Sequence, residues 1–267
     1  METVLLEAID EAMKARVIRR RERALNPIVR RAEAAMGRIF RRQGRVTVRE
    51  LAKRRHVFTE SAEEDAILGA FDAAANDPEM VSWIQTYGAA AFTEAMMATG
   101  TFLALDATFE LPFPDAASYA RRRSAELVRG LDATSRDSLR VLVATATEKG
   151  WSYNRLAAEI RLKFDGFARK MPQQHIQTRA HLVAVQELGQ AYEEGNATAA
   201  RAVQAAGIAL EKAWLTVGDD RVDPSCSANE GAGWIALDDT FPSGVMYPLD
   251  HVGCRCTSTR RRAEDQS

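Results

Sequence analysis

Apolar side chains recur at every third or fourth position along most of the first 207 residues of the chain. Leu5, Ile9, Met13 and Val17 form one such stripe, and arginines occupy positions on the other faces. This spacing places side chains on one face of an α-helix, whereas a half-buried strand alternates with a period of two. The pattern therefore predicts a mainly α-helical fold.

Proline, glycine and capping residues predict where these helices begin and end. Pro27 suits the first position of a second helix, Gly44 would end that helix, and Thr47 would cap a short third one. Thr134 and Ser152 are expected to cap two later helices. The first half of the chain is thus expected to be a succession of separate helices.

The composition changes near the C-terminus. A helix is expected over about residues 174–194, closed by Gly195, and a shorter one runs to about residue 207. From Ala213 onward the chain contains all three cysteines and two of the four tryptophans. Residues 213–217 and 233–237 have the composition of strands, with turn residues between them.

The sequence therefore predicts a mainly α fold, with an N-terminal helical region followed by a helical domain and a small α+β, loop-rich C-terminal module. The most apolar stretch, residues 88–105, is expected to be a buried helix and not a membrane span. Five parts are expected. They are a basic amphipathic helical arm (1–55), an acidic and apolar helical region (56–114), a helical domain (115–210), a β-containing Cys/His module (211–256) and a disordered tail (257–267).

The net charge of −1 conceals a strong segregation of charge. Residues 14–55 hold sixteen Lys and Arg against three acids, and residues 56–120 hold eleven acids and no Lys or Arg. Such asymmetry predicts a surface for a polyanion, a protein-docking surface, or two segments of the chain that face each other. Double-stranded DNA bound without sequence preference is the favoured partner. The arginines expected to contact phosphates are Arg16, Arg19, Arg20, Arg21, Arg23, Arg30, Arg31, Arg41 and Arg42.

Three cysteines and a histidine gather in the C-terminal module. Cys226, His251, Cys254 and Cys256 offer four ligands of the kind that zinc prefers, and Asp223 is a candidate to replace one of them. The alternative interpretation is a set of reduced, partly buried thiols with a hydrogen-bonded histidine. An odd number of cysteines is unlike a secreted disulfide framework and favours a reducing compartment.

The order of motifs around these cysteines is specific. A Trp-x-Thr segment precedes an Asp-x-Arg turn at residues 219–221, and the module closes with His-Val-Gly-Cys-Arg-Cys. A helix with Arg, Glu, Tyr and Gly at fixed intervals comes before them. From about residue 120 to residue 256, this order resembles the phage Mu F-like minor head proteins, also called phage head morphogenesis proteins. The residues that carry the resemblance are Arg179, Glu187, Tyr192, Gly195, Trp214, Thr216, Asp220, Arg221 and Arg255.

Two positions depart from that family's pattern: Asp223 stands where many members have a first cysteine, and Val252 replaces a proline. The resemblance implies a structural virion protein, associated with the portal vertex inside the capsid, that acts in head morphogenesis and in genome packaging or ejection. The implied partners are the portal protein, capsid or scaffold proteins and packaged DNA, with no membrane and no small-molecule substrate. The protein would be in the host cytoplasm during assembly.

Two other functions remain as alternatives. One is a DNA-binding accessory protein without sequence specificity. The other is a Cys/His enzyme or a toxin-associated module, in which Cys226 or Cys254 beside His251 would be the nucleophile. The sequence contains no P-loop, no dinucleotide-binding fingerprint and no Gly-x-Ser-x-Gly motif, so the expectation is that the protein is not an enzyme.

Overall fold

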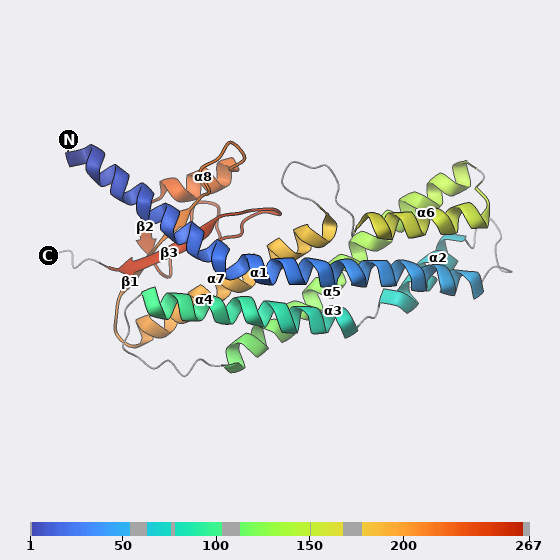
Figure 1. The fold of residues 1–267 in the computed structure, drawn as a ribbon, viewed down its shortest axis with the longest axis horizontal. Coiled ribbons are helices and arrows are strands. Elements are labelled where there is room, and N and C mark those ends of the chain that lie inside the picture. The colour runs from blue at the N-terminus through green and yellow to red at the C-terminus, as the bar shows by residue number, and fades with distance from the viewer. Residues whose placement is uncertain are drawn as a thin grey trace. The chain divides into compact units, whose positions relative to one another are not determined.

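The structure, a computed structural model, describes residues 2–53, 63–75, 78–102, 113–149, 151–167 and 178–263 (Figure 1). It confirms the predicted fold class, since long helices precede a small antiparallel sheet near the C-terminus. The helices are α1 (Glu2–Lys53), α2 (Glu63–Ala75), α3 (Pro78–Trp83), α4 (Ala89–Phe102), α5 (Phe113–Glu148), α6 (Tyr153–Gly166), α7 (Arg179–Ala205) and α8 (Pro224–Gly231), with a π-helical turn, η2 (Ile84–Gly88), before α4.

The chain forms two compact units, each assembled from segments that are distant in sequence. The first unit comprises Met1–Val29, Tyr87–Tyr119 and Val185–Ser267. The second comprises Arg30–Thr86 and Ala120–Ala184. The helices α1, α5 and α7 each contribute residues to both units.

The helix α1 is continuous, whereas the sequence predicts three helices in its place. Pro27 lies inside α1, although proline in a helix interior removes one backbone hydrogen bond and costs about 3 kcal/mol. Leu25, Ile28 and Val29 around it are all buried, and this burial offsets the cost of the proline.

Gly44 and Thr47 also fail to interrupt α1, for reasons of packing. A Cβ atom at Gly44 would lie 2.5 Å from Phe164 Cβ, so the glycine admits the aromatic side chain of α6 instead of ending the helix. Thr47 is buried, and its Oγ1 donates to the carbonyl of Gln43 at 2.8 Å within the helix. A threonine that bonds back to the preceding turn has no capping role.

Of the two later capping predictions, one is confirmed and one is wrong. Ser152 caps α6, as predicted, with its side chain accepting from Arg155 N at 3.4 Å. Thr134 instead lies inside α5 and donates to the carbonyl of Gly130 at 2.7 Å. The predicted helix start at residue 134 is therefore wrong.

The predicted end of a helix at Gly195 is also wrong, because α7 continues to Ala205. A Cβ atom at Gly195 would lie 2.3 Å from the carbonyl oxygen of Phe92, so the glycine permits close approach of α4. The next residue, Asn196, is buried and accepts a hydrogen bond from Thr99 Oγ1 at 2.7 Å. The Gly-Asn pair resembles a helix terminus in sequence, but its two residues serve contacts between α7 and α4.

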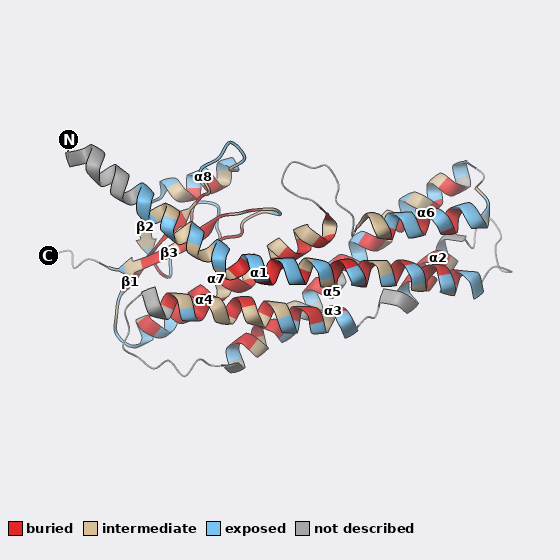
Figure 2. Ribbon diagram, in the orientation of Figure 1, coloured by how far each residue is buried: buried red, intermediate tan, exposed pale blue. Residues whose placement is uncertain are grey.

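The core of the second unit lies among α1, α2, α5 and α6. Val48, Leu51, Phe71, Leu139 and Phe164 are all buried within one apolar cluster. Figure 2 shows buried and exposed residues alternating at helical spacing along α1 and α6, as the apolar stripes predict.

The sheet has the strand order β2-β1-β3 and is antiparallel, with β1 at Leu210–Leu215, β2 at Trp234–Ala236 and β3 at Thr257–Arg262. The strand β2 lies within the predicted strand 233–237, whereas β1 overlaps the predicted strand 213–217 only at residues 213–215 and begins at Leu210. The third strand corrects the prediction that a disordered tail begins at residue 257. All six residues of β3 pair with β1, and Thr257, Ser258 and Arg260 are buried.

None of the helices in the described ranges is both long enough and apolar enough to cross a membrane. Residues 89–102 of the most apolar stretch form α4, in which Phe92, Ala95 and Met96 are buried. The prediction of a buried helix in this stretch is confirmed.

Substitution of two helical glycines tests the packing explanation for α7. Gly195→Ala should lower the free energy of unfolding by about 1–3 kcal/mol, because the added methyl group meets a backbone oxygen of α4. Gly130→Ala is the matched control, since nothing lies within 4 Å of its Cβ position, and it should raise stability by about 0.4–1 kcal/mol. Chemical denaturation followed by circular dichroism measures both. Equal effects of the two substitutions would contradict the packing explanation.

Candidate functional site

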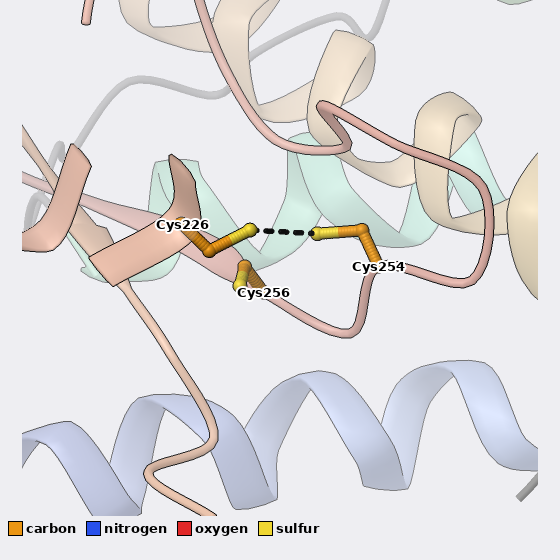
Figure 3. Close-up of side chains that lie close together, drawn as sticks. All are labelled: Cys226, Cys254 and Cys256. Atoms are coloured by element: carbon orange, nitrogen blue, oxygen red, sulfur yellow. Dashed lines mark hydrogen bonds between the residues drawn. The ribbon is translucent and has the colours of Figure 1, made fainter. Parts of the chain in front are cut away.

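The three cysteines come together in the C-terminal module (Figure 3). Cys226 lies on α8, Cys254 directly follows a turn at residues 252–253, and Cys256 directly precedes β3. Their sulfur atoms all lie within 4.8 Å of one another, and the Sγ atoms of Cys226 and Cys254 are 3.7 Å apart. The three side chains are 1–3 % exposed. The structure therefore forms a buried sulfur cluster from segments that are distant in sequence.

A helix cap positions Cys226, and a tight turn positions Cys254. Asp223 caps α8 by accepting from Ser225 N at 2.9 Å, which starts the helix just before Cys226. On the other side, Gly253 has a positive φ of 81° and Cys254 N donates to the carbonyl of His251 at 3.1 Å. This tight turn directs Cys254 back towards α8.

His251 adjoins the sulfur cluster, whereas Asp223 is engaged elsewhere. The Nε2 atom of His251 is 3.3 Å from Cys226 Sγ, and its Nδ1 atom is 3.2 Å from the carbonyl oxygen of Val252. The backbone and side chain of Ser225 hydrogen-bond to the exposed carboxylate of Asp223 and lower its pKa. Four of the five predicted metal ligands thus lie together, and Asp223 acts as a helix cap.

The three thiols differ in acidity because they interact with one another. Hydrogen bonding from Cys256 lowers the pKa of Cys254 to about 6, although burial opposes the shift. Burial raises the pKa of Cys226 to about 12, and the interaction with Cys254 raises the pKa of Cys256. The three thiols therefore interact as one group, and a negative charge on the cluster is held by hydrogen bonds between them. Such a buried thiolate suits a soft metal ion.

Thr216, a family-motif residue, is buried directly after β1. Thr216 donates to both carboxylate oxygens of Glu230, from its backbone N at 2.9 Å and from Oγ1 at 2.6 Å. Lys14 Nζ of α1 is 2.8 Å from the same carboxylate. Burial alone would raise the pKa of Glu230, but the bonds from Lys14 and Thr216 outweigh burial and lower it. One basic residue of the predicted arm is therefore paired inside the first unit.

Arg255, which stands between Cys254 and Cys256 in the sequence, forms a bidentate ion pair with Asp219. Its two terminal nitrogens lie 2.8 and 2.7 Å from the carboxylate oxygens of Asp219. The hydrogen bond from Arg255 lowers the pKa of Asp219 to about 2. Asp220 and Arg221 are exposed neighbours in the same turn. Asp219, the first residue of the Asp-x-Arg turn in the family resemblance, thus orients Arg255.

The family-motif residues of α7 have packing roles. In the second unit Arg179 donates to Ser135 Oγ and to the carbonyl of Leu131, at 3.1 and 3.0 Å, and its guanidinium stacks on Phe40 and Phe167. In the first unit Tyr192 is buried, and burial raises its pKa to about 12. Glu187 and Gly195 are also buried on α7.

A buried polar network that sequence reasoning missed joins α7 to the sheet. Glu193 accepts from Thr257 Oγ1 at 2.6 Å and from Ser258 Oγ at 2.5 Å. Arg260 is fully buried, and the charge of Glu193 favours its protonated form while burial lowers its pKa. Opposite Arg260 on β1, Lys212 is buried and donates to the carbonyl of Met246 at 2.8 Å. Burial lowers the pKa of Lys212 to about 8. A polar strand such as β3 gives no periodic apolar pattern, so the sequence contained no sign of this network.

The predicted phosphate-contacting arginines of α1 fall into two groups. Arg20 donates to the carbonyl of Ala98 at 2.8 Å, and Arg21 Nε lies 3.9 Å from the buried carboxylate of Glu193. These two and Arg41 are partly buried. The exposed members are Arg16, Arg19, Arg23, Arg30, Arg31 and Arg42. In the second unit Arg42, Arg45, Val46 and Arg49 line a hollow, so Arg45 and Arg49 extend the exposed basic face beyond the predicted set.

Comparison with known proteins supports the family suggested by the motifs. Residues 137–259, just under half of the chain, match the family model described as phage Mu protein F like protein. The match takes in the C-terminal part of α5, the helices α6 to α8, and the sulfur cluster. No curated protein and no solved structure gives a match. The predicted resemblance is confirmed over this segment.

Substitution of Glu193 tests the buried network. Glu193→Ala should lower the free energy of unfolding by about 1–3 kcal/mol, because it leaves the buried hydroxyl groups of Thr257 and Ser258 without their acceptor. Glu211→Ala is the control, because it removes a partly exposed pair with Arg261 and should cost less than about 1 kcal/mol. Denaturant titration of both variants measures the difference. A decrease of similar size in the two variants would contradict a central role for Glu193.

Proposed function

We propose, from the phage Mu protein F like segment at residues 137–259, that this chain is a structural bacteriophage protein of head morphogenesis. The observation that carries the proposal is the match itself, which covers both the sulfur cluster and the helix α7 that supports the sheet. Within the virion we assign the protein to the capsid interior beside the portal vertex, where it acts in genome packaging or ejection. Its partners are then the portal protein and capsid or scaffold proteins.

The burial of the sulfur cluster favours a structural role over catalysis. The Cys254 thiol has the lowest pKa of the three, yet its side chain is 1 % exposed. A nucleophile must reach the reacting atom of its substrate within hydrogen-bond distance or less. A substrate meets the Cys254 sulfur only after the module has opened, so the cluster suits a structural clasp.

Association with the phage head tests the proposal. When the full chain is co-expressed with the portal and capsid proteins of the same phage, it should co-sediment with assembled heads and co-purify with the isolated portal. Heads assembled without the portal are the control and should retain less of the protein. Its absence from heads that contain the portal would contradict the proposal.

A second role, binding of packaged double-stranded DNA, is supported by the basic face of α1. In the second unit Arg42, Arg45 and Arg49 follow one another at helical spacing around a hollow. Guanidinium groups spaced in this way suit phosphate oxygens, which offer no sequence information. The internal contacts of Arg20 and Arg21 restrict the proposed surface to the exposed arginines.

Salt dependence of DNA binding tests this second role. Replacement of Arg42, Arg45 and Arg49 by glutamine should reduce the slope of log K against log salt by about 1 for each phosphate that the variant no longer neutralises. The matched control replaces Arg140, Arg161 and Lys163, which are exposed on α5 and α6, by glutamine. Fluorescence anisotropy with a labelled duplex measures both slopes. Equal slopes for the two triple variants would show that the basic face docks protein and not DNA.

A further inference from the structure

We infer that Cys226, Cys254, Cys256 and His251 bind one zinc ion, which joins α8 to the start of β3. The four side chains come from two segments that are 25 or more residues apart, and the fold brings their ligand atoms together. This site is a property of the C-terminal module, and it does not depend on the role proposed for the protein in the phage head.

The observed separations agree with tetrahedral coordination. Two sulfurs bound at about 2.3 Å to one tetrahedral zinc lie about 3.8 Å apart, and a sulfur and an imidazole nitrogen lie about 3.6 Å apart. The Cys226 and Cys254 sulfurs are 3.7 Å apart, and His251 Nε2 is 3.3 Å from the Cys226 sulfur. The third sulfur lies within 4.8 Å of the other two. The three sulfurs can therefore surround one ion, and His251, which contacts the cluster at the Cys226 sulfur, is assigned as the fourth ligand.

The donor set selects the class of metal. Three thiolates and one imidazole in a buried site suit zinc, whereas calcium and magnesium require oxygen ligands. A sulfur-sulfur separation of 3.7 Å is well beyond the length of a disulfide bond, about 2.05 Å, and the cysteines are free thiols.

The surroundings of His251 match those of a metal-binding histidine. Its Nδ1 atom lies 3.2 Å from the Val252 carbonyl oxygen, which accepts a hydrogen bond from an N–H at Nδ1. That proton position leaves the lone pair of Nε2 directed at the sulfur cluster. Metal-binding histidines in general donate their second ring N–H to a carbonyl or carboxylate in this way.

Trp214 supplies a second supporting group. Its Nε1–H is buried without a hydrogen-bond partner among the described residues, and the side chain packs in one apolar cluster with Cys256. A metal-bound thiolate is a better hydrogen-bond acceptor than a neutral thiol. Occupation of the site by zinc therefore satisfies the indole donor, and Trp214 is assigned a positioning role for Cys256.

A crosslink at this point stabilises a part of the chain that has few apolar contacts. The described apolar cluster of the module consists of the three cysteines with Trp214, Phe241 and Leu249. Small modules of this kind gain folding free energy from a structural metal because the unfolded chain lacks the preformed site.

Metal analysis of the wild-type chain tests the inference. The full-length protein, without a histidine tag, is purified under reducing conditions without chelator and analysed by mass spectrometry for elements. We expect about one zinc per chain. Exchange with cobalt should give the visible bands of a tetrahedral site together with sulfur-to-cobalt charge transfer, and a strong chelator should lower the melting temperature.

Single substitutions identify the ligands. Cys226→Ser, Cys254→Ser, Cys256→Ser and His251→Gln should each abolish the cobalt spectrum or shift it to that of a site with fewer sulfurs or nitrogens. His181→Gln is the control, because His181 pairs with Glu33 in the second unit. Trp214→Phe keeps an aromatic ring in the core and should weaken zinc binding by about 10–100-fold.

Three results would overturn the inference. One is reduced wild-type protein that contains no zinc and gives no cobalt spectrum. Another is a cobalt spectrum that persists unchanged in the three serine variants. The third is a disulfide between two of the cysteines in freshly purified protein that takes up no metal after reduction. Unchanged zinc affinity in Trp214→Phe would overturn the role assigned to the indole.

Discussion

The burial of Glu193 on α7 is the constraint on which the C-terminal module depends. Its carboxylate accepts hydrogen bonds from Thr257 and Ser258, and this anchors the start of β3. Thr257 follows Cys256 directly, so the same anchor determines where the third thiol of the sulfur cluster lies. Ser258 is paired with Trp214 across the sheet. The two hydrogen bonds of Glu193 therefore fix the register that brings the indole beside the cysteines, and breaking them leaves charge unpaired in the interior.

The helix α7 combines such polar anchors with positions of close approach. A Cβ atom at Gly189 would lie 2.7 Å from Leu249 Cδ1, and one at Gly195 would lie 2.3 Å from the Phe92 carbonyl oxygen. Gln186 adds a hydrogen bond from Gly253 N at 3.1 Å, at the turn that directs Cys254. The helix thus positions the cysteine-bearing turn by hydrogen bonding and the surrounding chain by close packing. The family match at residues 137–259 includes both α7 and the sulfur cluster.

The distribution of charge in α1 separates internal from external roles. Lys14 pairs with Glu230, while Arg20 and Arg21 interact with α4 and α7 within the first unit. In the second unit Arg42 is exposed, and its Nη1 atom lies 3.7 Å from a carboxylate oxygen of the exposed Glu79. A pair at that distance on the surface contributes little to stability. The exposed arginines are therefore the part of the basic segment that is suited to an external polyanion.

Local chemistry in the sequence determined the helical class, the Ser152 cap, two strands and the set of four clustered ligands, because each depends on neighbouring residues or on residue type. The ends of the helices were decided by tertiary structure. Pro27 and Gly195 have the chemistry of helix termini, yet both lie inside helices, because burial of adjacent apolar residues and close backbone approach outweigh local preference. The same holds for β3, which is polar along its length and resembles a disordered tail. It becomes a strand because the fold pairs it with β1 and brings Glu193, 64 residues away in sequence, to Thr257.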